Sequence, residues 1–205
     1  MARINSNDKK EVRRLLLKKA AEEFAKKGFD KANINEISRS AGYASGTVYN
    51  YFKSKDKLFG AVVSEAARLT VERFVEARAG ASARDSLRAL AVADTEVLRE
   101  EEAFVKVLAG EAMDPSSKDY KLIIAGLGPF INTVSKILKQ GQKNGEIRKD
   151  KPVGQLSLFF LGLLTLLYIQ HWKSLTGWPK IKEIPDLAVT LFLDGAGRAV
   201  PKKHT

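Results

Sequence analysis

Residues 41–52, with the sequence AGYASGTVYNYF, gather hydrogen-bonding side chains into one short segment. Five of them fall within seven positions: Ser45, Thr47, Tyr49, Asn50 and Tyr51. Hydroxyl and amide groups both donate and accept hydrogen bonds, so such a cluster suits recognition of a polar partner. Val48 and Phe52 are four residues apart and form the apolar face that holds the segment in place. We therefore expect a turn followed by a short helix whose other faces are exposed.

Two helical patterns precede this segment. Residues 8–28 carry an apolar residue at every fourth position, which predicts an amphipathic helix that ends at Gly28. Asn33 and Glu36 have the spacing of a capping box, which predicts a second helix from about residue 34. Gly42 can adopt the positive φ that ends this helix and turns the chain into the next one. Three short helices with a tight turn between the last two form a helix-turn-helix arrangement.

Basic charge is concentrated in the same part of the chain. The formal net charge is +11, and residues 1–57 hold 14 Lys or Arg against 7 Asp or Glu. Such an excess attracts polyanions, of which nucleic acid and an anionic membrane surface are the obvious ones. A merely solvated basic helix explains the charge equally well.

Composition narrows the class of protein. The chain of 205 residues has 44% apolar residues, enough to bury a core, and it has no cysteine. The absence of cysteine excludes disulfides and thiolate chemistry and agrees with a reducing compartment. The first residues are polar and charged, without the apolar stretch of a secretion signal, so we expect a cytoplasmic protein.

The N-terminal residues resemble the DNA-binding domain of TetR/AcrR-type transcriptional regulators. The resemblance covers about residues 10–62 and is carried by Phe24, Gly28, Ile37, Ala41-Gly42, Gly46-Thr47-Val48-Tyr49, Tyr51-Phe52 and the run from Lys53 to Leu58. It implies an all-α chain: a three-helix helix-turn-helix DNA-binding domain over residues 1–54, then a helical ligand-binding and dimerisation domain over residues 55–205. It also implies a repressor that binds a palindromic double-stranded operator as a homodimer and is released by a small, largely apolar effector.

The resemblance assigns a DNA-binding surface to Asn33, Asn35, Ser45, Gly46, Thr47, Tyr49, Asn50, Tyr51 and Lys55. Asn50 is the first candidate for reading a base through its side-chain amide, and Thr47, Tyr49 and Lys55 are expected to contact phosphates. Ala44 stands where a capping serine is usual, and alanine cannot cap, so Ser45 is the candidate substitute cap, a role that would compete with a DNA contact from Ser45. Packing of the two tyrosines and simple solvation of Lys55 are the alternatives.

The remaining sequence predicts further helices. Residues 55–78 read as one helix, and residues 84–112 read as two helices that separate near the acidic run 100–102. A long helix follows over residues 118–142, and Pro129 should kink it because proline removes a backbone hydrogen bond.

Residues 153–169 form the most apolar run in the chain. Its unbroken part spans about 14 residues, or about 21 Å as a helix, so we expect no membrane insertion. A helix that is apolar all round must be covered on two sides. The resemblance places this run and the final helix, residues 186–199, in a dimer interface through Phe160, Leu164, Leu167, Ala188, Leu191, Phe192, Gly195 and Ala199. Packing inside one chain is the alternative.

A ligand pocket is harder to locate from the sequence. The candidates are Phe104, Leu108, Met113, Phe130, Tyr168, His171 and Trp172, and ordinary core packing explains them equally well. Tyr168, His171 and Trp172 share one helix face and are the first choice for its polar end.

We find no catalytic motif, no cofactor site and no metal site. The only other histidine is His204, and no nucleophile pattern or phosphate-binding glycine loop occurs. The preferred hypothesis is therefore that the chain is a non-enzymatic regulator. The second is a basic helical small-molecule carrier or membrane-surface protein without specific DNA binding.

Overall fold

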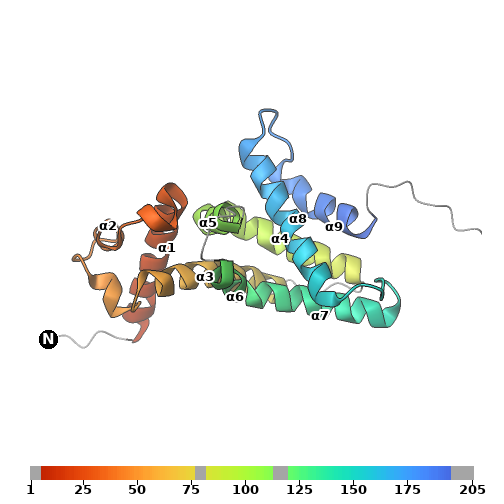
Figure 1. The fold of residues 1–205 in the computed structure, drawn as a ribbon, viewed down its shortest axis with the longest axis horizontal. Helices are drawn as coiled ribbons and strands as arrows, with labels where there is room; N and C mark the ends of the chain where they lie inside the picture. The colour runs from red at the N-terminus through yellow and green to blue at the C-terminus, as the bar shows by residue number, and fades with distance from the viewer. Residues whose placement is uncertain (1–5, 77–81, 113–119, 195–205) are drawn as a thin grey trace, which may run out of the picture. The chain divides into compact units, whose positions relative to one another are not determined.

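The computed structural model describes residues 6–76, 82–112 and 120–194, and every regular element in these ranges is helical (Figure 1). The all-α prediction is confirmed. The elements are α1 (Ser6–Lys31), α2 (Ile34–Ser40), the short 3-10 helix η1 (Thr47–Asn50), α3 (Lys55–Glu76), α4 (Ala83–Glu100), α5 (Glu102–Ala112), α6 (Tyr120–Gly126), α7 (Gly128–Asn144), α8 (Val153–Lys173), the 3-10 helix η2 (Ile181–Glu183) and α9 (Ile184–Leu193).

The chain folds as two compact units. Unit 1 comprises residues 1–70 and 96–130, and unit 2 comprises residues 71–95 and 131–205. Three helices, α3, α4 and α7, therefore contribute residues to both units. The boundary predicted after residue 54, between a DNA-binding and a ligand-binding domain, is a functional division that these compact units do not test, so it stays a prediction.

Unit 1 contains the N-terminal head, whose core is formed by the apolar faces of α1, α2 and α3. In α1, the apolar residues predicted at every fourth position include Leu16, Ala20 and Phe24, and these three are buried. The rings of Phe24 and Phe59 meet edge to face, with centroids 5.3 Å apart. Such pairs add to the stability that burial alone provides, so α1 and α3 form a rigid base for the segments between them.

The region predicted as one kinked helix is two helices, α6 and α7, with a break at Leu127. Pro129 lies in the first turn of α7, where its missing N–H group costs nothing. Within unit 1, α6 packs closely on α3: a Cβ atom added at Gly126 would lie 2.4 Å from Cγ1 of Val63. The proline therefore ends one helix and starts another instead of bending a single one.

Unit 2 is built from α8 and α9, which lie side by side, together with parts of α3, α4 and α7 (Figure 1). Its core contains Leu87, Leu90, Val134, Leu138, Phe160, Leu164, Leu167, Ala188 and Val189. Arg88 on α4 binds Asp186 on α9, with Nε 2.5 Å from Oδ1. The hydrogen bond from this guanidinium lowers the pKa of the Asp186 carboxyl.

By length and composition, α8 is the one helix among the described residues that could cross a membrane. The helix spans 21 residues, so the length argument from residues 153–169 does not exclude a membrane span. Only 28% of its most apolar window is buried, yet Phe160, Leu164 and Leu167 pack inside unit 2. One such helix is also what the core of a packed helical unit contains.

Candidate nucleic-acid interface

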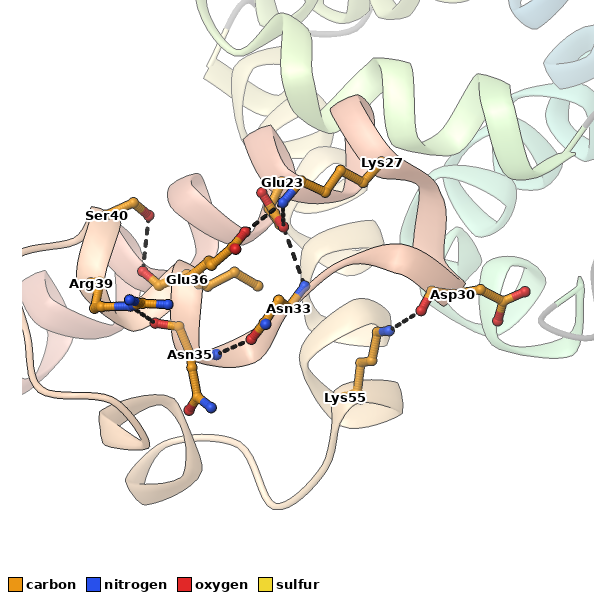
Figure 2. Close-up of polar contacts among 10 residues, drawn as sticks. Glu23, Lys27, Asp30, Asn33, Asn35, Glu36, Arg39, Ser40 and Lys55 are labelled. Atoms are coloured by element: carbon orange, nitrogen blue, oxygen red, sulfur yellow. Dashed lines mark hydrogen bonds and ion pairs between the residues drawn. The ribbon is translucent and has the colours of Figure 1, made fainter.

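The second helix of the head starts at a well-formed cap. Asn33 has an extended backbone, and its side-chain oxygen accepts a hydrogen bond from the Asn35 N–H group at 2.9 Å. The predicted partner Glu36 does not complete a capping box. Instead, the Asn33 N–H group donates to Oε1 of Glu23 on α1, at 3.2 Å (Figure 2). The cap therefore ties α2 to α1 as well as starting α2.

Glu36 forms an ion pair with Lys27 of α1 instead (Figure 2). The Lys27 ammonium group binds both Glu23 and Glu36, and these hydrogen bonds raise the pKa of Lys27. The hydrogen bond from Lys27 in turn lowers the pKa of Glu36. Sequence spacing alone favoured the local Asn33–Glu36 pair, but the fold brings a lysine from the preceding helix to the same carboxylate.

The turn after α2 follows the prediction. Gly42 has φ of 80°, in the left-handed region that glycine adopts without strain. Its N–H group donates to the Arg39 carbonyl, and the Tyr43 N–H group donates to the Ser38 carbonyl. These bonds satisfy the carbonyl groups at the end of α2 and reverse the chain sharply.

The segment expected to form a recognition helix contains only one turn of 3-10 helix, η1. Gly46, immediately before it, has φ of 87°, which interrupts any longer α-helix. Thr47 and Val48 are β-branched and weaken the helix further. Because residues three apart align in a 3-10 helix, Thr47 and Asn50 lie on one side, while Val48 lies on another and is buried.

Ser38 supplies the cap that Ala44 cannot provide. Its side chain is fully buried, and its hydroxyl oxygen accepts a hydrogen bond from the Val48 N–H group at 3.2 Å. The N-cap position of η1 is Gly46, which makes no side-chain cap bond, so Ser45 need not act as the substitute cap. The sequence offered only a weak signal for Ser38, a small polar residue on the inner side of α2 next to Ile37.

The nine residues predicted for DNA binding fall into two groups by exposure. The exposed ones are Asn33, Asn35, Ser45, Tyr49 and Asn50. The half-buried ones are Gly46, Thr47, Tyr51 and Lys55. Tyr49 has 54% of its surface accessible, which is more than a packing aromatic would show. The Asn50 amide forms no hydrogen bond with the described residues, so its donors and acceptor are available.

Lys55 has a structural role in addition to any contact with DNA. Its ammonium group donates to the Asp30 carbonyl at 2.9 Å (Figure 2). The same group lies 4.9 Å from the centre of the Phe29 ring. Both contacts hold the start of α3 against the end of α1. A phosphate contact from Lys55 would therefore either replace its contacts with Asp30 and Phe29 or form in addition to them.

We expect Ser38→Ala to lower the stability of the head by about 1–2 kcal/mol, because the Val48 N–H group loses its buried acceptor. Urea unfolding measures the loss, and hydrogen exchange at the Val48 amide locates it. Ser40→Ala, two residues away on the same helix, removes an exposed hydroxyl that donates to the Ile37 carbonyl and should be nearly neutral. Equal losses in both variants would contradict the proposed cap.

The predicted pocket residues are divided between the two units. Phe104 and Phe130 are buried in unit 1. In unit 2, Tyr168 is buried and its hydroxyl donates to Oδ2 of Asp94 at 2.6 Å. Burial and this carboxylate raise the Tyr168 pKa well above its usual value, so the phenol stays neutral.

The other pocket candidates have partners of their own or lie outside the described residues. Trp172 is half-buried beside the Tyr168 ring, and Nδ1 of the half-buried His171 lies 2.9 Å from the Pro179 carbonyl. The Leu108 side chain and Met113 are outside the part of the chain that the structure describes. The pocket assignment stays a prediction.

Four of the residues predicted for the dimer interface are buried inside unit 2: Phe160, Leu164, Leu167 and Ala188. Leu191 is exposed, Phe192 is half-buried, and Gly195 and Ala199 lie outside the described residues. The large apolar residues exposed on α8 are Leu158, Phe159 and Leu166. Since an interface needs accessible side chains, these three and Leu191 are better candidates than the buried four.

Residues 16–62 match the family model described as bacterial regulatory proteins, tetR family. The chain belongs to the TetR family. The matched residues run from α1 into α3 and include the capped turn and η1, so the family match covers the whole candidate interface.

Curated relatives and solved structures agree with this TetR assignment. The HTH-type transcriptional regulator YvdT of Bacillus subtilis (strain 168), itself uncharacterised, is 28% identical over 134 residues, covering 64% of this chain and 68% of the relative. The fatty acid metabolism regulator protein of the same organism is 26% identical over 135 residues, covering 65% and 70%. The B. subtilis regulator FadR, solved with stearoyl-CoA, has a TM-score of 0.78 at 20% identity and covers 90% of this chain and 99% of its own. At that identity the solved structure shows a shared fold.

Proposed function

We propose that this TetR-family chain is a ligand-responsive repressor that works in the cytoplasm and binds a palindromic operator as a homodimer. The observation that supports operator binding is the exposure of the hydrogen-bonding side chains of Tyr49 and Asn50 on η1. The Ser38 cap holds η1, which lies in the part of the sequence with the larger excess of basic charge. Thr47 and Asn50 point to one side of η1, so both can reach the same strip of a DNA major groove.

The roles proposed on DNA divide between base and phosphate contacts. Asn50 has a free amide that can pair with an adenine edge in the major groove. Tyr49, Thr47 and Lys55 are assigned to phosphates, which set position and affinity and carry no direct sequence information. Asn33 uses its side-chain oxygen as a cap, so its proposed contribution is mainly to orient α2.

Operator binding is tested with duplexes from the region upstream of the protein's own gene. Asn50→Ala is expected to weaken specific binding by about tenfold or more, and to leave the steep salt dependence unchanged because no phosphate contact is lost. Asn132→Ala, an exposed asparagine in unit 2, is the matched control and should bind normally. If the unmodified chain binds these duplexes no better than random DNA, the proposal fails.

We further propose an effector of the fatty-acyl class with an apolar chain. The support is the likeness to a fatty acid metabolism regulator and to a regulator solved with stearoyl-CoA. An effector lowers operator affinity only by the amount that it prefers the released state. Long-chain acyl-CoA should therefore reduce operator binding, whereas coenzyme A without the acyl chain should not.

A further inference from the structure

The connection between α8 and α9 carries two large apolar side chains in contact with solvent. Leu175 is fully exposed, and Trp178 has 53% of its surface accessible. Figure 1 shows this connection, in blue, extending beyond the ends of both helices. Isolated exposed apolar residues are ordinary, but two within four residues at the tip of one loop form a small apolar patch.

Hydrogen bonds hold this loop in one conformation. The Ser174 hydroxyl oxygen accepts from the N–H groups of Thr176 and Trp178, each at 3.2 Å. Nδ1 of His171 donates to the Pro179 carbonyl at 2.9 Å, because a carbonyl oxygen can only accept. The loop is therefore built to keep Leu175 and Trp178 outward, and little conformational entropy is lost when they bind something.

Three lysines flank the apolar tip in the sequence. Lys173, Lys180 and Lys182 are exposed, and none of them forms an ion pair with the residues that the structure describes. The nearest acidic residue in sequence, Glu183, accepts a hydrogen bond from the Lys180 N–H group at 3.1 Å. The loop thus combines apolar side chains with unneutralised positive charge.

We propose that the loop of residues 174–180 docks on an anionic lipid surface. Leucine and tryptophan would enter the boundary between head groups and acyl chains, where amphipathic aromatic side chains concentrate, and the lysines would pair with lipid phosphates. This docking is peripheral and does not require α8 to cross the bilayer. It is also independent of the proposed operator binding, because every residue involved lies in unit 2.

At this loop, charge favours a lipid surface over a second copy of this chain, whose proposed dimer contact is the exposed face of α8. The two sequence ranges of unit 2, residues 71–95 and 131–205, hold 16 Lys or Arg against 9 Asp or Glu, so another copy presents mostly like charge. The carboxylates of Asp150, Asp186 and Asp194 are already paired with arginines of the same unit. Anionic lipid supplies the complementary charge that a second copy lacks.

The expected affinity is modest and reversible. Each lysine near an anionic membrane improves binding by about fivefold, so three contribute about a hundredfold. Partial burial of the leucine and the tryptophan adds about tenfold or more for each. Both contributions are needed, so binding should require anionic lipid and should fall with salt.

Tryptophan fluorescence provides a local test. The chain has two tryptophans, so Trp172→Phe leaves Trp178 as the only reporter. With vesicles of phosphatidylglycerol and phosphatidylcholine, Trp178 emission should shift to the blue and be quenched by brominated acyl chains. Vesicles of phosphatidylcholine alone should produce neither change.

Matched charge variants test the lysines by vesicle sedimentation of the full chain. K173Q/K180Q/K182Q is expected to lose about a hundredfold in partitioning, whereas K143Q/K149Q/K151Q, with the same change in charge elsewhere in unit 2, should lose less than about fivefold. L175S should lose about tenfold. All these substitutions are at exposed positions, so the helical content should not change.

Three results would overturn the proposal. Sedimentation without any change in Trp178 emission would mean that the basic head binds the vesicles. Equal losses in the two triple variants would mean that net charge, and not this loop, is responsible. A weaker dimer in L175S with unchanged vesicle binding would identify a second copy of the chain as the occupant.

Discussion

Phe160→Ala is expected to destabilise the folded chain by about 3–5 kcal/mol, the usual cost of removing a buried aromatic side chain. Phe160 on α8 is completely buried, and its ring meets the Phe192 ring of α9 at a centroid distance of 5.2 Å. The variant should unfold at a lower urea concentration with an unchanged slope. Unfolding should be followed over a range of protein concentrations, because the proposed dimerisation would add a concentration-dependent contribution to stability.

Phe159→Ala is the matched control, one residue earlier on the same helix. Phe159 has 73% of its surface accessible, so its removal opens no cavity inside unit 2. If the exposed face of α8 forms the dimer contact, this variant should weaken dimerisation by about 30-fold and keep its helical content. The opposite pattern, with a folded monomer for Phe160→Ala and a normal dimer for Phe159→Ala, would return the interface to the residues predicted from the sequence.

Gly126→Ala should be destabilising by about 1–3 kcal/mol, although alanine normally favours a helix over glycine. The added methyl group would lie 2.4 Å and 2.9 Å from the Val63 side chain and 3.3 Å from the Ser64 backbone nitrogen. Val63 is fully buried on α3, so it cannot move aside without disturbing the core. The result should be a lower unfolding midpoint and a looser contact between α6 and α3.

Gly110→Ala separates this steric effect from helix propensity. Gly110 is exposed on α5, and nothing lies within 4 Å of the position that its Cβ would occupy. This variant should gain about 0.5–1 kcal/mol, because alanine loses less backbone entropy than glycine. Two identical substitutions are thus expected to change stability in opposite directions, and a gain in both would show that α6 adjusts freely.

The head illustrates how far local patterns reach. The apolar repeat of α1, the helix break at Gly28, the positive φ of Gly42, and the buried pair Val48 and Phe52 were all predictable, because each depends on residues close in sequence. The capping-box prediction was correct for Asn33 and wrong for Glu36. Asn33 caps α2 as expected, but the partner of its N–H group comes from α1, ten residues away, and no spacing rule identifies such a contact.

Unit 2 shows the limit of such local patterns. Apolar character correctly predicted a helix over residues 153–169, but a helix that is apolar all round does not reveal which face meets its own chain. In α8 the side chains of Phe160, Leu164 and Leu167 are buried, whereas that of Phe159 is exposed. Phe159 and Phe160 are adjacent and chemically identical, yet the first is exposed and the second is buried.

The amino-acid sequence by itself determined the helical class, the TetR family and the place of the candidate DNA-binding segment, since these depend on local periodicity, turn residues and side-chain types at fixed spacing. Only the tertiary structure decided that Ser38 caps η1, that Lys55 binds the end of α1, and that Trp178 is held outward on its loop. The physical reason is that each of these facts depends on packing between helices: local propensity forms an element, but burial and hydrogen bonding with distant residues decide which of its atoms remain available.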